Sequence, residues 1–128
     1  MATAVTSSKI VAYDTFAAVT SIAATANTDG GEEEFTITPA KGCQSGVIIV
    51  GGTGSAADGD ITYSIAAGDL WAGKALSGTI TQNTTVMIQV ETARVMQDDG
   101  TISLTLDPAA TDKLLTDHAA SVKFIELR

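Results

Sequence analysis

Two glycine-rich stretches have the residue types and spacing of phosphate-binding loops. Residues 52–57 fit the permissive dinucleotide fingerprint Gly-x-Gly-x-x-Ala, and residues 68–75, GDLWAGKA, match the pattern G-x-x-x-x-G-K. Both kinds of site need a helix that begins at the glycines, because the phosphate binds the free N–H groups of its first turn. Here each stretch runs into residues that read as strand and turn, and Ala75 replaces the Ser or Thr that would hold Mg²⁺. We therefore predict no nucleotide binding and no cofactor, with the glycines forming turns between strands.

A nucleophile and a general base are each present once, since Cys43 is the single cysteine and His118 the single histidine. A catalytic triad holds its base between a nucleophile and a carboxylate. Asp117 and Ser121 are near neighbours of His118 on a short predicted helix, where side chains rarely converge in that way. Lys41 lies close to Cys43, and a nearby cation lowers the pKa of a thiol. The sequence has no second histidine that could act as a general base for this thiol. We predict no catalytic residues and a protein that is not an enzyme.

Carboxylates in adjacent loops are the one group that has the chemistry of a metal site. Asp58, Asp60 and Asp69 are candidate ligands for Ca²⁺, which needs several converging oxygen atoms. The spacing is not that of an EF-hand, because the DGD stretch lacks the later ligands. Aspartate is also common in turns, where its side chain bonds the local backbone. We predict that no metal is bound, and these three residues are the weak candidates.

Trp71 and Leu70 lie in a glycine-rich connection rather than in an alternating strand. An aromatic residue in such a loop anchors a protein interface, stacks on a ligand, or folds back to plug one end of the core. We take Trp71 and Leu70 as the interface candidates.

The chain is acidic, with 15 Asp and Glu residues against 7 Lys and Arg residues, a net charge of -8 and a pI near 4.3. Such a surface repels phosphate backbones and anionic lipids, so we expect neither a nucleic-acid partner nor a membrane partner. A single cysteine excludes an internal disulfide. The first residues, MATAVTSSKIVAYD, lack the features of a signal peptide. We expect synthesis in the bacterial cytoplasm.

Alternating hydrophobicity predicts mostly strands. Residues 60–66, 84–92 and 100–107 alternate with a period of two, residues 34–38 form a shorter version, and residues 47–50 and 121–128 complete the set. We expect the core to contain the inward residues Ile61, Ile65, Val86, Ile88, Val90, Ile102, Leu104 and Leu106. Residues 107–120 predict a helix, because Asp107 can cap it and Pro108 suits its first position.

These elements predict one all-β domain over residues 1–128. We expect an antiparallel β-sandwich, jelly-roll or Ig-like, of about eight strands with one short helix near the C-terminus. The alternative is a partly open β-barrel. Residues 1–8 are expected to form an N-terminal arm that is flexible or exchanged with a second copy.

One local stretch carries a resemblance. Residues 7–14, SSKIVAYD, are similar to a segment of the lambda-type head decoration family, and the whole chain resembles the auxiliary virion proteins of tailed bacteriophages. The resemblance implies a non-enzymatic structural protein that decorates a capsid, binds a capsid or tail protein lattice and forms a homo-oligomer, which we expect to be a trimer. It also implies a place in the virion.

The alternative function is a carbohydrate-binding or adhesion module. Its stacking residues would be Trp71, Tyr63 and Tyr13. A low aromatic content of 5% and the lack of an export signal weigh against this alternative.

Overall fold

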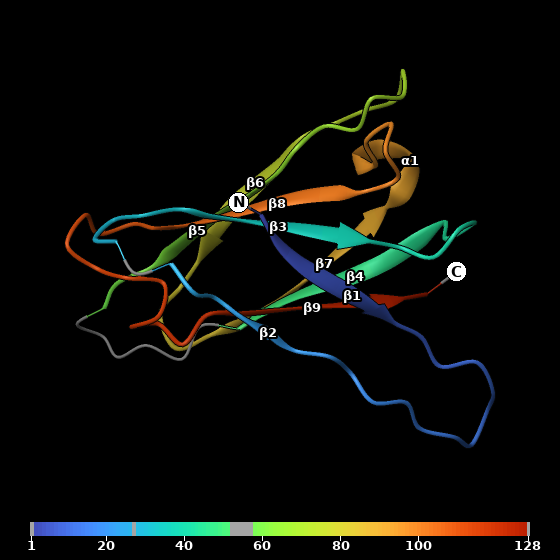
Figure 1. The fold of residues 1–128 in the computed structure, drawn as a ribbon, viewed down its shortest axis with the longest axis horizontal. Coiled ribbons are helices and arrows are strands. Elements are labelled where there is room, and N and C mark those ends of the chain that lie inside the picture. Colours follow the sequence, from blue (N-terminus) through green and yellow to red (C-terminus); the bar gives the residue numbers. More distant parts are fainter. Residues whose placement is uncertain (1, 27, 52–57, 128) are drawn as a thin grey trace.

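The computed structural model describes residues 2–26, 28–51 and 58–127 (Figure 1). Strands account for almost all of its regular structure. The elements are β1 (Thr3–Ser8), β2 (Ile22–Ala23), β3 (Glu33–Thr38), β4 (Ser45–Gly51), β5 (Ile61–Ile65), β6 (Leu76–Ile80), β7 (Thr85–Glu91), α1 (Thr92–Val95), β8 (Ile102–Pro108) and β9 (Ser121–Glu126).

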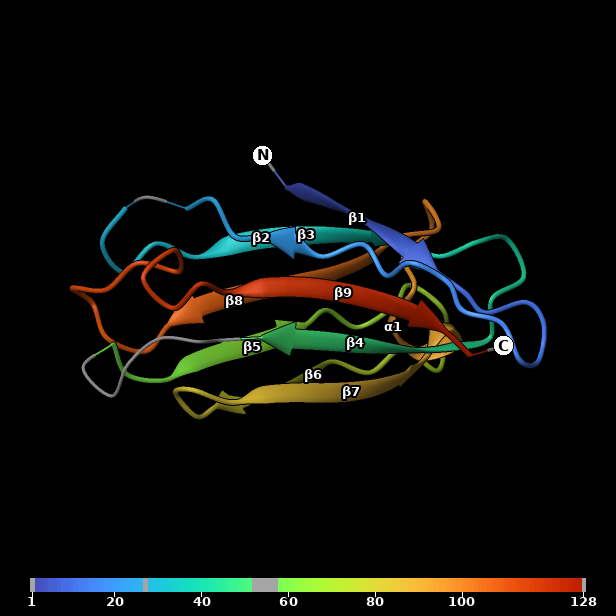
Figure 2. The same ribbon diagram turned by 90° about the horizontal axis from the view of Figure 1, so that it is seen from below.

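The strands form one mixed sheet in the order β6-β5-β8-β3-β1-β9-β4-β7, with β2 added to β9. The sheet curls into a nearly closed barrel in which β6 and β7 are the two ends (Figure 2). The prediction of a sandwich is wrong, and the alternative of a partly open barrel is the correct one. A sandwich needs two separate sheets, but β1 joins the two halves: Thr3–Thr6 pair with β3 and Ser7–Ser8 pair with β9.

β1 is also the reason that the sheet is not purely antiparallel. It runs parallel to both of its neighbours, whereas the other pairs are antiparallel. The residues expected to form a loose or exchanged arm therefore lie inside the sheet of this single chain. Exchange of β1 between two copies stays a prediction.

The interior of the barrel is filled by the period-two residues of the strands. Of the expected core residues, Ile61, Ile65, Val90, Ile102, Leu104 and Leu106 are buried, and Val86 and Ile88 are partly buried against them. β3, β4 and β9 add Phe35, Ile37, Ile48, Val50, Val122 and Phe124. β9 keeps a regular alternation, and its inward position after Phe124 is Glu126, whose Oε1 accepts a hydrogen bond of 2.7 Å from the Ala40 N–H.

The predicted helix over residues 107–120 is wrong. Asp107 and Pro108 are the last residues of β8, and the residues that follow form consecutive turns. A tertiary partner takes a backbone group that the helix would use: Lys113 O accepts from the Gly30 N–H at 2.8 Å, and the Asp117 N–H donates to Leu114 O at 3.1 Å instead of to Lys113 O. The Ala109 N–H donates to Asp60 O at 2.9 Å and ties the start of the segment to the chain before β5. In the described part of the chain the one helix is α1. Its four residues are too few to show the helical period of hydrophobic residues in the sequence. No described helix is long and apolar enough to cross a membrane.

Candidate functional site

Large apolar side chains are exposed mainly in two loops that follow strands at the same end of the barrel. Trp71 is 98% exposed in the loop of residues 66–75, and Tyr13 and Phe16 are 97% and 95% exposed in the segment of residues 9–21. The two loops project to opposite sides, the first beside β6 and the second beside β1 (Figure 1). They therefore form two separate apolar surfaces.

The loop of residues 66–75 is held firmly. The Gly68 and Lys74 N–H groups both donate to Arg94 O in α1, at 2.8 and 2.9 Å. The loop packs so closely that a Cβ on Gly68 would lie 2.6 Å from Met96 O, and one on Gly73 would lie 2.0 Å from Gly68 O. Glycine is therefore required at both positions, and the loop presents Trp71 from a fixed backbone. The alternative in which Trp71 plugs the core is wrong for this chain.

The segment of residues 9–21 is held loosely. Ile10 and Val11 are 59% and 87% exposed, in addition to Tyr13 and Phe16. Within residues 10–19 the described hydrogen bonding is one local contact, in which Thr15 Oγ1 donates to Ala12 O at 2.7 Å. Sequence reasoning missed Ile10, Val11 and Phe16, because these residues follow neither the helical nor the strand period that marks a core.

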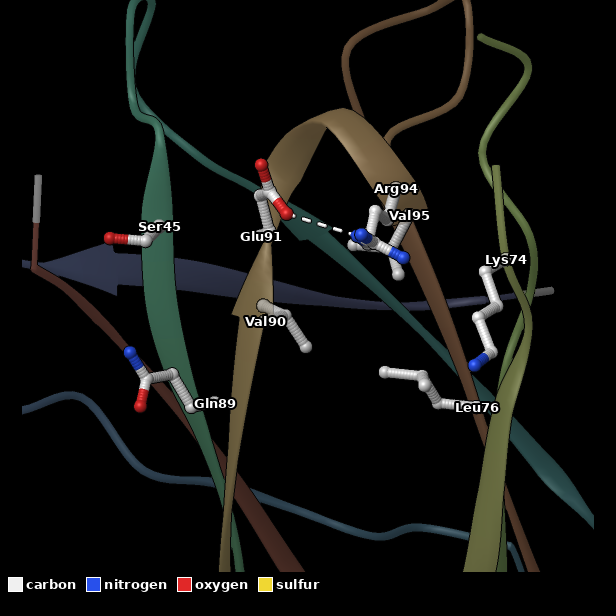
Figure 3. A pocket seen from close by; sticks show the side chains of 8 residues that line it. All are labelled: Ser45, Lys74, Leu76, Gln89, Val90, Glu91, Arg94 and Val95. Carbon is white, nitrogen blue, oxygen red and sulfur yellow. Dashed lines mark hydrogen bonds and ion pairs between the residues drawn. The ribbon is translucent and has the colours of Figure 1, made fainter. Parts of the chain in front are cut away.

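A groove of about 520 Å³ lies where the barrel fails to close (Figure 3). We call this gap between β6 and β7 the seam. Leu76 on β6 and Val90 on β7 point toward each other across it, and Val95 lies beside them. At the rim, Arg94 Nε donates to Glu91 Oε2 at 3.0 Å, and Lys74 stands on the β6 side. The lining residues are Ser45, Lys74, Leu76, Gln89, Val90, Glu91, Arg94 and Val95.

The candidate calcium ligands do not converge. Asp58 and Asp60 precede β5 and Asp69 follows it, so β5 separates them along its length. Asp60 Oδ1 accepts from the Gln82 N–H at 3.1 Å, and Asp69 Oδ2 accepts from the Asp98 N–H at 2.7 Å, so each carboxylate bonds the backbone of a different, distant loop. Across residues 2–26, 28–51 and 58–127 no group of three or more Asp, Glu, His or Cys side chains could hold a metal ion. The glycines of residues 52–57 lie outside the described residues.

Cys43 and His118 lie at opposite ends of the barrel, before β4 and before β9 respectively. Burial raises the pKa of the Cys43 thiol, and the negative charge of Glu126 raises it further. Of the cations, Lys9 is the one that lowers this pKa, and Lys41, although close in sequence, is not among its causes. His118 is buried, with Nδ1 at 2.7 Å from Leu114 O.

The three aromatic residues of the carbohydrate alternative do not form one platform. Tyr63 packs against the core, with its ring directly over Gly78 of the neighbouring strand. Trp71 and Tyr13 belong to the two loops that project to opposite sides of the barrel. No geometry therefore favours a common sugar site.

No family model, no curated protein and no solved structure matches this chain.

Proposed function

We propose that the protein is a non-enzymatic structural protein that forms homo-oligomers and decorates a protein lattice, as the capsid decoration proteins of tailed phages do. The observation that carries this proposal is the near-complete exposure of Trp71, Tyr13 and Phe16 on two loops. Aromatic residues are costly to leave in water and are enriched at the centres of protein interfaces. The resemblance of residues 7–14 to the lambda-type decoration family supports the choice of lattice.

The two loops suit two different contacts. The loop of residues 66–75 is fixed by its bonds to α1, so docking Trp71 and Leu70 into a pocket costs little conformational entropy. We assign this loop to the lattice. The backbone of residues 9–21 makes few described hydrogen bonds, so it gains bonds by pairing with another strand. We assign this segment to contacts between copies, with a trimer as the expected closed form.

The proposal is tested by light scattering and by sedimentation. At micromolar concentration we expect the mass of a trimer of the 13.0 kDa chain. The fluorescently labelled protein should co-sediment with empty shells that are assembled from the shell protein encoded beside its gene. Trp71→Ser should abolish co-sedimentation and leave the trimer intact.

Leu127→Ser is the matched control, because it removes an exposed apolar side chain outside both loops. It should leave co-sedimentation unchanged. A monomer that does not sediment with the shells would overturn the proposal. Equal loss of binding in Trp71→Ser and Leu127→Ser would overturn the assignment of the loop.

A further inference from the structure

We propose that residues 9–13 of a second copy enter the seam as an added strand and complete the barrel. This inference rests on the self-association in the proposed function and names the surfaces that form it. One surface is the seam between β6 and β7. The other is the loosely held start of the segment of residues 9–21.

The seam presents two strand edges that lack a partner. In the described sheet β6 pairs only with β5, and β7 pairs only with β4. Natural proteins protect such edges with lysine or proline, and neither strand contains Lys, Arg or Pro. Met87 of β7 is in addition 77% exposed. An unprotected, partly apolar edge is a template for a further strand.

The seam is closed by a turn at one end, and the groove lies at the other end. At one end a short turn joins β6 to β7, with the Thr84 N–H donating to Thr81 O at 3.1 Å. At the other end the loop before β6 is bonded to Arg94 O of α1. Both strands are thus tied at their ends, and in the described sheet no ladder forms between their facing edges.

The segment of residues 9–13 has the same length as β6, and its side chains and backbone are exposed. It is five residues long, as β6 is, and it ends at Asp14, where a positive φ of 57° turns the chain. Its side chains are exposed, and its backbone makes few hydrogen bonds in the described structure. Pairing would satisfy backbone groups on both of its edges.

The segment cannot reach the seam of its own chain. β1, which leads into the segment, lies in the middle of the strand order, whereas the seam lies between the two ends of that order. Figure 2 shows β1 on the side of the barrel opposite β6 and β7. The contact must therefore join two different surfaces of two copies, and repetition of such a contact closes a ring when the rotation allows it.

One register fits the side chains. If the segment runs antiparallel to β6 with Ala12 opposite Leu76, then Ile10 lies opposite Gly78, beside the Tyr63 ring that covers this glycine. Ala12 then faces the part of the groove that Leu76, Val90 and Val95 line, and Ile10 faces the interior beside it.

The same register keeps the charged residues outside. Val11 lies opposite Ser77 and Lys9 opposite Thr79, on the outer face where Ser77 and Thr79 are exposed. Asp14 reaches Lys74 at the rim. Among the described residues the one ion pair is that of Arg94 with Glu91, so Lys74 is available to this carboxylate.

A disulfide tests the register directly. In a Cys43→Ser background, Val11→Cys and Ser77→Cys should form a bond under mild oxidation, because residues opposite each other on paired strands have suitable Cα separations. The bond should link separate chains into covalent dimers and trimers. Val11→Cys with Ser64→Cys is the control, since Ser64 lies one strand further from the seam and its strand is paired on both edges. Equal linkage in both pairs would overturn the proposal, as would no linkage in a sample that light scattering shows to be a trimer.

Two single variants test which side chains of the segment face the inside of the barrel and which face outward. Ile10→Asp places a charge on the inner face and should raise the dissociation constant of the oligomer about tenfold or more. Val11→Asp places the same charge on the outer face and should leave the constant nearly unchanged. Both residues are exposed in the single chain, so both variants should fold. A nonspecific apolar contact gives the reverse order, because Val11 is the more exposed of the two, and that result would refute the inserted strand.

Discussion

Two stretches of similar length and without regular secondary structure behave in opposite ways. Residues 109–120 fold back onto one end of the barrel, where Leu115, His118 and Ala120 are buried and hydrogen bonds reach Asp60 and Gly30. Residues 9–21 at the other end expose Tyr13 and Phe16 and make few bonds. The first stretch serves the fold. The second contributes little to it, and its exposed apolar side chains are the basis for the proposed contact outside the single chain.

The contrast between the two stretches is tested most strongly by shortening one buried side chain in residues 109–120. Leu115→Ala should lower the free energy of unfolding by about 2–5 kcal/mol, because it removes buried methyl groups and leaves a cavity. Urea denaturation followed by circular dichroism measures this loss. A loss below about 1 kcal/mol would show that residues 109–120 are not part of the cooperative core.

The next largest effect on the free energy of unfolding is expected from Glu33, a buried carboxylate at the same end of the barrel as residues 109–120. Burial of Glu33 by itself raises its pKa, but the hydrogen bonds from Thr3, Ala26 and Thr25 together hold that pKa below the ordinary value of 4.5. Thr3 Oγ1 donates at 2.6 Å, and the Thr25 and Ala26 N–H groups donate at 2.8 and 2.9 Å. Glu33 therefore fastens β1 and the chain after β2 to the start of β3.

Glu33→Gln should cost about 1–3 kcal/mol of unfolding free energy at pH 7, because the neutral amide cannot accept all of these bonds. A carboxyl group with a lowered native pKa stabilises the protein above its ordinary pKa, and this contribution is lost as the pH falls through the native pKa. The difference between wild type and variant should thus be constant from pH 7 to pH 5 and shrink below about pH 4.5. A difference that does not depend on pH would contradict the role of the charge.

The smallest effect on folding should come from the exposed stretch. Phe16→Ser should change the free energy of unfolding by less than about 0.5 kcal/mol, because the side chain is in water in the single chain. The measurement is made at a protein concentration at which light scattering shows a monomer. A loss comparable to that of Leu115→Ala would mean that residues 9–21 pack on their own barrel, and the contrast between the two stretches would disappear.

Hydrophobic patterns predicted β3, β4, β5, β7, β8 and β9 and most of the core, because inward and outward residues in β5 and β8 differ sharply in hydrophobicity. The pattern could not show how the strands join. β1 reads as a small, polar N-terminal stretch, yet it closes the gap between β3 and β9. Nothing local in residues 3–8 indicates two neighbours so distant in sequence, and this one strand decides between a sandwich and a barrel.

The helix over residues 107–120 failed for a related reason. Its capping residues and leucines are real local signals, but Asp107 and Pro108 extend β8, and the Gly30 N–H takes Lys113 O, which the helix needs. The sequence singled out Trp71 but left open whether its side chain is buried or exposed. It did not show the seam, because a missing ladder between β6 and β7 leaves no trace in either strand. In each case the structure depends on contacts with distant parts of the chain, which the local sequence does not show.

The position of β1 also sets the order of events during synthesis. Ser7 and Ser8 pair with Phe124 and Ile125, so the barrel cannot be completed until the chain has been made beyond β9. Such long-range pairing gives a high contact order, and proteins of this kind fold slowly. We expect residues 9–21 to be positioned only when β1 docks, so that newly made chains become competent to assemble only after folding. Docking of β1, the strand that closes the barrel, would thereby delay entry into the proposed oligomer until the chain is complete and folded.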